Sequence, residues 1–348
     1  MPLFIDSARF GSAAGLNAGN CITIGLVNNM PDAAVEATER QFVDLIRQAA
    51  PDAVVLLKLF AIPELPRSDA MRAELAERYR DISELWDTPV DGLIVTGTEP
   101  RAKNLKDEPY WQTLSAIVDW ARVHTASTIW SCLAAHAAVL HADGVERRPL
   151  KQKLFGTFAC ALAADHPMTH DVTVPFTVPH SRYNDLPART LTAAGYKILS
   201  QSPEAGVDIF AKQDGSFFLF FQGHPEYDAD TLLREYRRDA ARFLAGERDK
   251  YPAMPLHYFN DEAAVLADAF SARARAERGS ALIGEFPNAA LEAGLDNPWR
   301  QSALGIYQKW TAYLRARKAE RRPLGVPLRR TWRDWPLALR RASEGSTR

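Results

Sequence analysis

Short apolar runs alternate with longer helical patterns in the first part of the chain, and this alternation constrains the fold most strongly. The apolar runs predict strands at 21–27, 54–60, 91–95 and 128–130, and the intervening patterns predict helices at 32–49, 108–124 and 133–141. Continuously apolar strands such as 92–95 are typical of a sheet that is covered on both faces. We therefore predict an α/β fold in which helices flank a mostly parallel, flavodoxin-like sheet.

Further elements follow in the second half of the chain. Strands are predicted at 172–178, 207–212 and 216–221, with a hairpin turn at 213–215, and helices at 230–246, 263–278 and 302–317. The charged pattern at 230–246 indicates a surface helix. No repeat or low-complexity linker divides the chain, so we expect one domain over 1–318, with a helical insertion at about 261–298. The remaining residues, 319–348, form a basic tail that contains Pro, Arg and Trp.

Charge and cysteine content exclude several classes of function. The 348 residues carry 42 Lys+Arg and 43 Asp+Glu, a balance that offers no global support for binding nucleic acid or a membrane. The three scattered cysteines predict neither a disulfide framework nor a zinc site, and no apolar stretch is long enough to span a bilayer. We expect a cytoplasmic protein without a metal, a nucleic-acid partner or a membrane partner.

Cys132 lies between the apolar strand 128–130 and the helix that begins at Leu133. This strand-turn-helix position is where a nucleophile is held on a tight turn, and a helix N-terminus favours a thiolate. The N–H group of Leu133 is then a candidate oxyanion donor. Taken alone, Cys132 is better explained as an inert structural cysteine than as a nucleophile, and Cys21 and Cys160, which lie in apolar segments, are most simply core residues.

His224 and Glu226 follow the apolar strand 216–221 directly. In an extended segment, residues two apart point to the same side, so Glu226 can orient the imidazole. Open α/β sheets also bind ligands at the carboxyl ends of their strands. Together with Cys132, these residues predict a Cys–His–Glu triad. The alternative is a strand end that carries a surface ion pair.

Two other strand ends are candidate parts of a site. Gly97 follows the predicted strand 91–95 and can supply a second oxyanion donor, although an ordinary strand-to-helix turn has the same sequence pattern. The segment 179–183, Pro-His-Ser-Arg-Tyr, is rich in polar donors. It indicates either substrate contact or a surface turn.

Several segments in chain order resemble the homoserine O-acyltransferase family, which has a class I glutamine-amidotransferase-like fold. The segments that carry the resemblance lie at 26–31, 38–42, 91–97, 110–111, 132–135, 153–156, 179–183, 223–228, 235–239, 258–259 and 299–300. They span most of the chain. The resemblance implies an enzyme of methionine biosynthesis that acylates L-homoserine from acyl-CoA, without a cofactor, and we expect a homodimer.

The resemblance also implies roles for individual residues. Cys132 corresponds to the acyl-accepting nucleophile of a ping-pong reaction, His224 to the general base and Glu226 to its orienting partner. Lys153 resembles the active-site lysine of the family, and we assign it with Leu133 and Gly97 to the oxyanion and acyl part of the site. Ser181 and Arg238 resemble residues that contact the amino-acid substrate. An ammonium and a guanidinium suit a substrate that carries carboxylates.

The acyl group is predicted from one loop position. In the family, Glu at this position marks acetyl users and Gly marks succinyl users, whereas an ungapped alignment places Arg101 here. Because Arg101 could pair with a succinyl carboxylate, we favour succinyl-CoA as the donor. Glu99, two residues away, keeps acetyl-CoA as an alternative, and L-serine stays an alternative acceptor because one methylene discriminates by only about 1–3 kcal/mol.

Two further functions share this fold. A glutamine-hydrolysing amidotransferase would use the same triad, but the nucleophile segment lacks the usual Gly-x-Cys-x-Gly pattern. A non-catalytic binding protein is the other alternative, and the joint presence of Cys132, His224 and Glu226 disfavours it.

Overall fold

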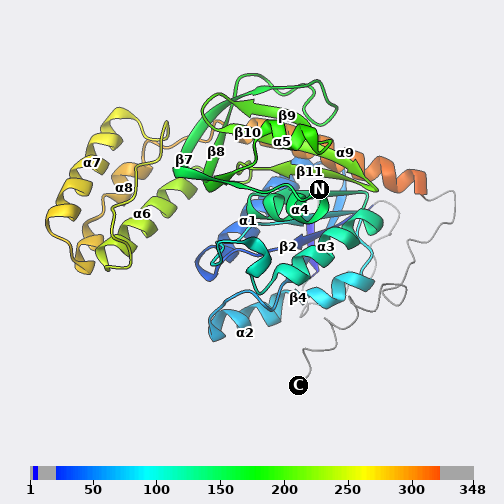
Figure 1. Cartoon of the computed structure of the whole chain (residues 1–348), viewed down its shortest axis with the longest axis horizontal. Helices are drawn as coiled ribbons and strands as arrows, with labels where there is room; N and C mark the ends of the chain where they lie inside the picture. Colours follow the sequence, from blue (N-terminus) through cyan, green and yellow to red (C-terminus); the bar gives the residue numbers. More distant parts are fainter. Residues whose placement is uncertain (1–2, 7–20, 322–348) are drawn as a thin grey trace.

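The computed structural model describes residues 3–6 and 21–321, and its centre is an 11-stranded, mostly parallel sheet (Figure 1). The strands run in the order β1-β3-β2-β5-β6-β11-β10-β9-β7-β8, with β4 beside β3. The parallel strands are β1 (Leu3–Asp6), β2 (Cys21–Val27), β3 (Val54–Ala61), β4 (Arg80–Asp81), β5 (Gly92–Val95), β6 (Ser127–Ser131) and β11 (Ser216–Phe221). The antiparallel strands are β10 (Gly206–Asp214), β9 (Lys197–Ser202), β7 (Arg148–Leu162) and β8 (Phe176–Asp185).

Helices cover both faces of the sheet, as the continuously apolar strands predict. On one face, α1 (Asp32–Ala49) and α9 (Arg300–Arg321) pack on a core that includes Ile94. On the other face, α3 (Trp111–His124), α4 (Leu133–Asp143) and α5 (Ala188–Ala193) pack on a core that includes Leu93 and Val95. Because successive strand residues point to opposite faces, β5 must be apolar at every position. Within the described ranges, no helix is both long and apolar enough to cross a membrane.

A helical lobe stands beside the β7–β8 end of the sheet (Figure 1). It consists of α6 (Thr231–Leu244), α7 (Asp261–Ala276), the 3₁₀ turn η3 (Ser280–Glu285) and α8 (Asn288–Glu292), which surround a third apolar core. The predicted insertion at 261–298 falls in this lobe. The predicted surface helix 230–246 is α6, and one of its faces is buried in the lobe core. Helix α9 continues across the boundary predicted at 318/319, and the rest of the basic tail, 322–348, lies outside the described residues.

Most predicted elements of the first half form within a few residues of their expected bounds. The helix at 32–49 and the strand at 216–221 are confirmed with the same ends. A strand forms where one was predicted at 172–178, but the predicted bounds are wrong, because β8 begins only at Phe176, after Pro175, and runs to Asp185. The segment 179–183 therefore lies inside a strand rather than at its end. The elements that were not predicted are α2 (Asp69–Arg78), η1 (Ile82–Asp87), η2 (Leu105–Asp107), β1, β4, β7, α5, β9, η3 and α8.

Candidate active site

Cys132 occupies a strained turn between β6 and α4. Its φ of 51° and ψ of −114° lie in a region that non-glycine residues rarely adopt, and such strain clusters at functional sites. The turn is held because the N–H of Cys132 donates to Phe221 O at 2.8 Å, which ties β6 to the end of β11. The thiol is consequently presented at the carboxyl end of the parallel strands, partly exposed to a cavity.

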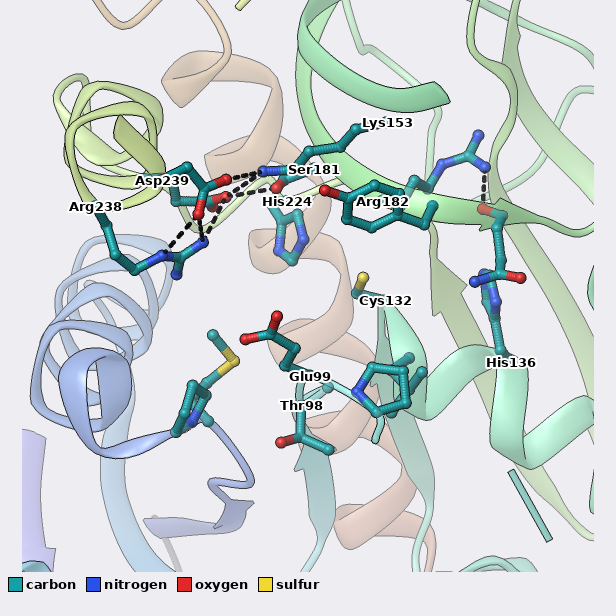
Figure 2. A pocket seen from close by; sticks show the side chains of 18 of the residues that line it. Thr98, Glu99, Cys132, His136, Lys153, Ser181, Arg182, His224, Arg238 and Asp239 are labelled. Carbon is teal, nitrogen blue, oxygen red and sulfur yellow. Dashed lines mark hydrogen bonds and ion pairs between the residues drawn. The ribbon is translucent and has the colours of Figure 1, made fainter. Parts of the chain in front are cut away.

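His224 lies next to Cys132 and is held on three sides (Figure 2). Its backbone N–H donates to Pro179 O at 2.8 Å, its Nδ1 lies 2.8 Å from Glu226 Oε1, and its ring stacks on Tyr227 with centroids 4.2 Å apart. Burial by itself lowers the pKa of His224, but the Glu226 carboxylate and the Cys132 sulfur raise this pKa well above its usual value. The environment of His224 therefore favours the protonated imidazolium.

Gly97 and Leu133 lie together beside the thiol. A Cβ atom at Gly97 would lie 2.9 Å from the nitrogen of Leu133 and 3.3 Å from Ser131 O. Leu133 opens α4, and N–H groups in the first turn of a helix have no partner within the helix. The structure thus brings the two predicted oxyanion donors to one place, and only glycine leaves room for this approach.

Lys153, Ser181 and Arg238 meet in a charged cluster on one side of the cavity (Figure 2). The Lys153 ammonium lies 3.3 Å from both Glu235 and Asp239, and the Ser181 hydroxyl donates to Glu235 at 2.5 Å. Arg238 donates to Asp239 Oδ1 at 3.1 Å through Nη2. Lys153 therefore belongs with the predicted substrate-binding residues rather than with the oxyanion donors.

The cavity that joins these groups has a volume of about 650 Å³. Its charged lining comprises Glu99, Glu235, Asp239 and Glu247 against Arg147, Lys153, Arg182, Arg238, Arg242 and Arg248. Cations outnumber anions, so the cavity suits an anionic ligand.

The structure does not bring Arg101 to this cavity, which corrects the predicted acyl-recognition role. The side chain of Arg101 is exposed, and its backbone N–H donates to Glu108 Oε1 at 2.5 Å. The buried Glu108 fixes the loop so that Glu99 lines the cavity instead, with Glu99 lying 3.6 Å from Arg242. An ungapped alignment could not show this, because the loop path depends on a carboxylate seven residues further along the chain.

Seven charged residues of the cavity were not predicted from the sequence: Arg147, Arg182, Glu235, Asp239, Arg242, Glu247 and Arg248. Glu235 and Asp239 are four residues apart on α6 and so share one face of the helix, a spacing that could have revealed them. Arg182 lies within the polar segment 179–183, but nothing in the sequence around Arg147 distinguishes it from a surface arginine.

Fold and site together define a class of α/β protein in which a cysteine at a strand-to-helix turn faces a histidine–carboxylate pair. A family model described as homoserine O-succinyltransferase matches residues 11–321. The chain belongs to the homoserine O-succinyltransferase family, a family of transferases.

Curated relatives agree with the family model. A homoserine O-succinyltransferase of Rhodopseudomonas palustris is 51% identical over 84% of this chain and 88% of its own length. Another from Bradyrhizobium japonicum is 49% identical over 84% of this chain and 90% of its own length. Among solved structures, a glutamine amido transferase from Methylobacillus flagellatus is 15% identical with a TM-score of 0.47, over 84% of this chain and 95% of that chain.

Proposed function

We propose that this protein transfers the succinyl group of succinyl-CoA to the hydroxyl of L-homoserine, through a thioester on Cys132. The observation that carries the proposal is the strained turn that presents Cys132 beside the His224–Glu226 pair, at the floor of a cation-rich cavity. The identity of the acyl group and of the acceptor is inferred from the names of the relatives, which are homoserine O-succinyltransferases.

In the first half-reaction, the thiolate of Cys132 attacks the thioester carbonyl of succinyl-CoA. The N–H groups of Leu133 and Gly97 stabilise the oxyanion, a contact worth about 2.7–4 kcal/mol per donor. The carbon–sulfur bond to CoA then breaks, and the imidazolium of His224 protonates the departing CoA thiolate. His224 is left neutral beside the succinylated Cys132.

In the second half-reaction, homoserine occupies the site vacated by CoA. The neutral His224 accepts the proton of the homoserine hydroxyl, and the oxygen attacks the thioester. The collapse of the tetrahedral intermediate releases O-succinylhomoserine and restores the thiolate–imidazolium pair. In this proposal Lys153, Ser181 and Arg238 bind the amino-acid end of homoserine, since a guanidinium binds a carboxylate through two hydrogen bonds.

A second candidate is acetyl transfer, and the position of Glu99 favours it. Glu99 lines the cavity where Arg101 does not. By the resemblance described above, Glu in this loop marks acetyl users, since its charge repels a succinyl carboxylate.

The deciding experiment incubates purified protein with homoserine or serine and with succinyl-CoA or acetyl-CoA, and follows the release of free CoA thiol. We expect the fastest release with succinyl-CoA and homoserine, and none above background with Cys132→Ala. Release that persists in Cys132→Ala contradicts the nucleophile assignment. Faster release with acetyl-CoA than with succinyl-CoA would contradict succinyl transfer and support acetyl transfer.

A further inference from the structure

The cavity has a second side, across Cys132 from the Lys153 cluster. Figure 2 shows Arg182 and His136 there, with Lys153 and Asp239 on the opposite side of the thiol. Arg147, which acts electrostatically on His136, and Asn184, whose carbonyl accepts from Arg182, also line the cavity. If the cluster around Lys153 binds homoserine, the acyl chain on Cys132 extends toward these residues.

Arg182 is not free to bind a ligand, because its guanidinium is already paired. Nη1 donates to Asn184 O at 2.6 Å and to Asp185 Oδ1 at 3.1 Å, Nη2 donates to Ala205 O, and Nε donates to His180 at 3.4 Å. The charge of Arg182 is therefore compensated by Asp185, and its donors are used within the protein.

His136 contributes no positive charge to this side. Gln222 Oε1 accepts from the Leu186 N–H at 2.9 Å, while Gln222 Nε2 donates to Val207 O at 2.8 Å, so the orientation of this amide is fixed. His136 Nε2, 3.1 Å from the same Oε1, must then carry the proton. Burial lowers the pKa of His136 to about 3, which keeps the ring neutral and leaves its Nδ1 an acceptor.

Arg147 is the cation that retains an unused donor. Its Nη2 donates to Lys103 O at 3.2 Å, but Nη1 is buried without a hydrogen-bond partner in the described structure. Glu108, a neighbouring carboxylate, accepts the backbone N–H groups of Arg101 and Ala102 at 2.5 and 2.6 Å. A buried guanidinium N–H without a partner costs free energy until an acceptor arrives.

We propose that Arg147 binds the free carboxylate of the succinyl group and so selects a dicarboxylic acyl donor. The inference rests on the proposed function, since it assigns a binding residue to the carboxylate end of the proposed succinyl donor. Cys132 and Arg147 line the same cavity and interact electrostatically, so an acyl chain on the sulfur shares this cavity with the guanidinium. An acetyl group has no carboxylate and gains nothing from Arg147.

The test compares kcat/KM for succinyl-CoA and acetyl-CoA in wild-type protein, Arg147→Gln, Arg147→Lys and Arg148→Gln. We expect Arg147→Gln to lower the value for succinyl-CoA by about 10- to 100-fold, mainly through KM, with little change for acetyl-CoA. Arg147→Lys should recover part of the loss. Arg148 is the matched control because it is the next residue along the chain and the first of β7, is exposed and lies outside the cavity lining. Equal losses on both donors, or a loss in Arg148→Gln of the same size, would overturn the inference.

A second measurement does not depend on turnover. Free succinate should slow the alkylation of Cys132 by iodoacetamide in wild-type protein and in Arg148→Gln, but not in Arg147→Gln, as read from the mass of the Cys132 peptide. Equal protection in all three proteins, or none in the wild type, contradicts the inference. Wild-type protein that is protected by succinate but releases no CoA would instead contradict the proposed function alone.

Discussion

The two nitrogens of His224 have separate tasks in the proposed reaction. Nδ1 is held 2.8 Å from Glu226 Oε1, so Nε2 is the nitrogen left to exchange protons with the sulfur and the substrates. A comparable pair occurs on the surface, where His257 Nε2 lies 3.0 Å from Glu204 Oε2 and both side chains are more than half exposed. Burial and the adjacent thiol distinguish the two pairs.

We predict that Glu226→Gln lowers kcat by on the order of 10³- to 10⁴-fold, because a neutral amide neither stabilises the imidazolium nor selects its tautomer. Steady-state CoA release measures this loss. The pKa of His224, followed by NMR of its ring protons, should fall as well. Glu204→Gln is the matched control and should retain wild-type activity. An unchanged His224 titration in Glu226→Gln would contradict the prediction.

A buried carboxyl behind His224 predicts a pH dependence of stability. Burial raises the pKa of Asp208 to about 6, against the hydrogen bond from Ser200 and the charge of Arg182. The folded state thus binds this proton more tightly than the unfolded state. The stabilising contribution is complete below the unfolded pKa near 3.8 and is lost as the pH rises through about 6.

We expect this titration to remove up to about 3 kcal/mol from the free energy of unfolding between pH 4 and pH 7. Urea denaturation of wild-type protein and Asp208→Asn at several pH values measures the difference, since the amide cannot titrate. His180, whose Nε2 lies 3.7 Å from Asp208, and His224 interact with the same carboxyl. Both histidines are present in the two proteins, so the difference between the pH profiles reports the titration of Asp208. Parallel pH profiles in the two proteins would refute the assignment to Asp208.

At the scale of elements, the site depends on the meeting of two strand ends. The loop after β5 carries Gly97, and the turn after β6 carries Cys132 and Leu133. These strands are neighbours in the sheet, so their carboxyl ends lie side by side. The close approach of Gly97 to the Leu133 nitrogen is a property of the pair of elements rather than of either alone.

We predict that Gly97→Ala lowers kcat by about 10²- to 10³-fold, because the added methyl group lies where the oxyanion donors converge. Gly305→Ala provides the control, since a Cβ at Gly305 in α9 meets no atom within 4 Å. Both proteins should be compared by CoA release and by circular dichroism. A Gly97→Ala protein with wild-type kcat would exclude this oxyanion site.

Helices and strands could be predicted from the sequence where the local hydrophobic pattern agrees with the burial that the folded chain imposes. The helix at 32–49 and the strand at 216–221 have strong periodicity or a long apolar run, and both form with the predicted ends. Strand β7 was missed because its first half, 148–154, is exposed or half-buried and includes two Lys and a Gln, so that no continuous apolar run marks it. For the candidate site, residues at the ends of buried strands could be found from sequence, whereas Arg147 depends on a loop path that only the folded chain defines.

At the scale of the whole molecule, α9 ties the end of the described chain to the centre of the sheet. Trp310 is fully buried, its Nε1 donates to Ser127 Oγ at 2.9 Å, and its ring lies over Gly92. A Cβ at Gly92 would come within 2.6 Å of Leu314. The helix therefore completes the core on this face.

We predict that Trp310→Ala lowers the free energy of unfolding by about 3–5 kcal/mol, because a large cavity opens and Ser127 loses its donor. Urea denaturation measures this change. Gln308→Ala, at an exposed position two residues away, should change it by less than about 0.5 kcal/mol. A small effect at Trp310 would mean that α9 docks without contributing to the global stability.

Helix α6 belongs to two parts of the molecule. One face carries Glu235, Arg238 and Asp239 into the cavity, and the other packs Leu232, Tyr236 and Phe243 into the core of the helical lobe. The thiol and the histidine are carried by the sheet instead. Substitutions in the lobe can thus move the α6 groups that we propose to contact the acceptor, while the geometry around Cys132 stays intact. Divergence of acceptor preference during evolution should accordingly accumulate in α6 and the helices packed behind it.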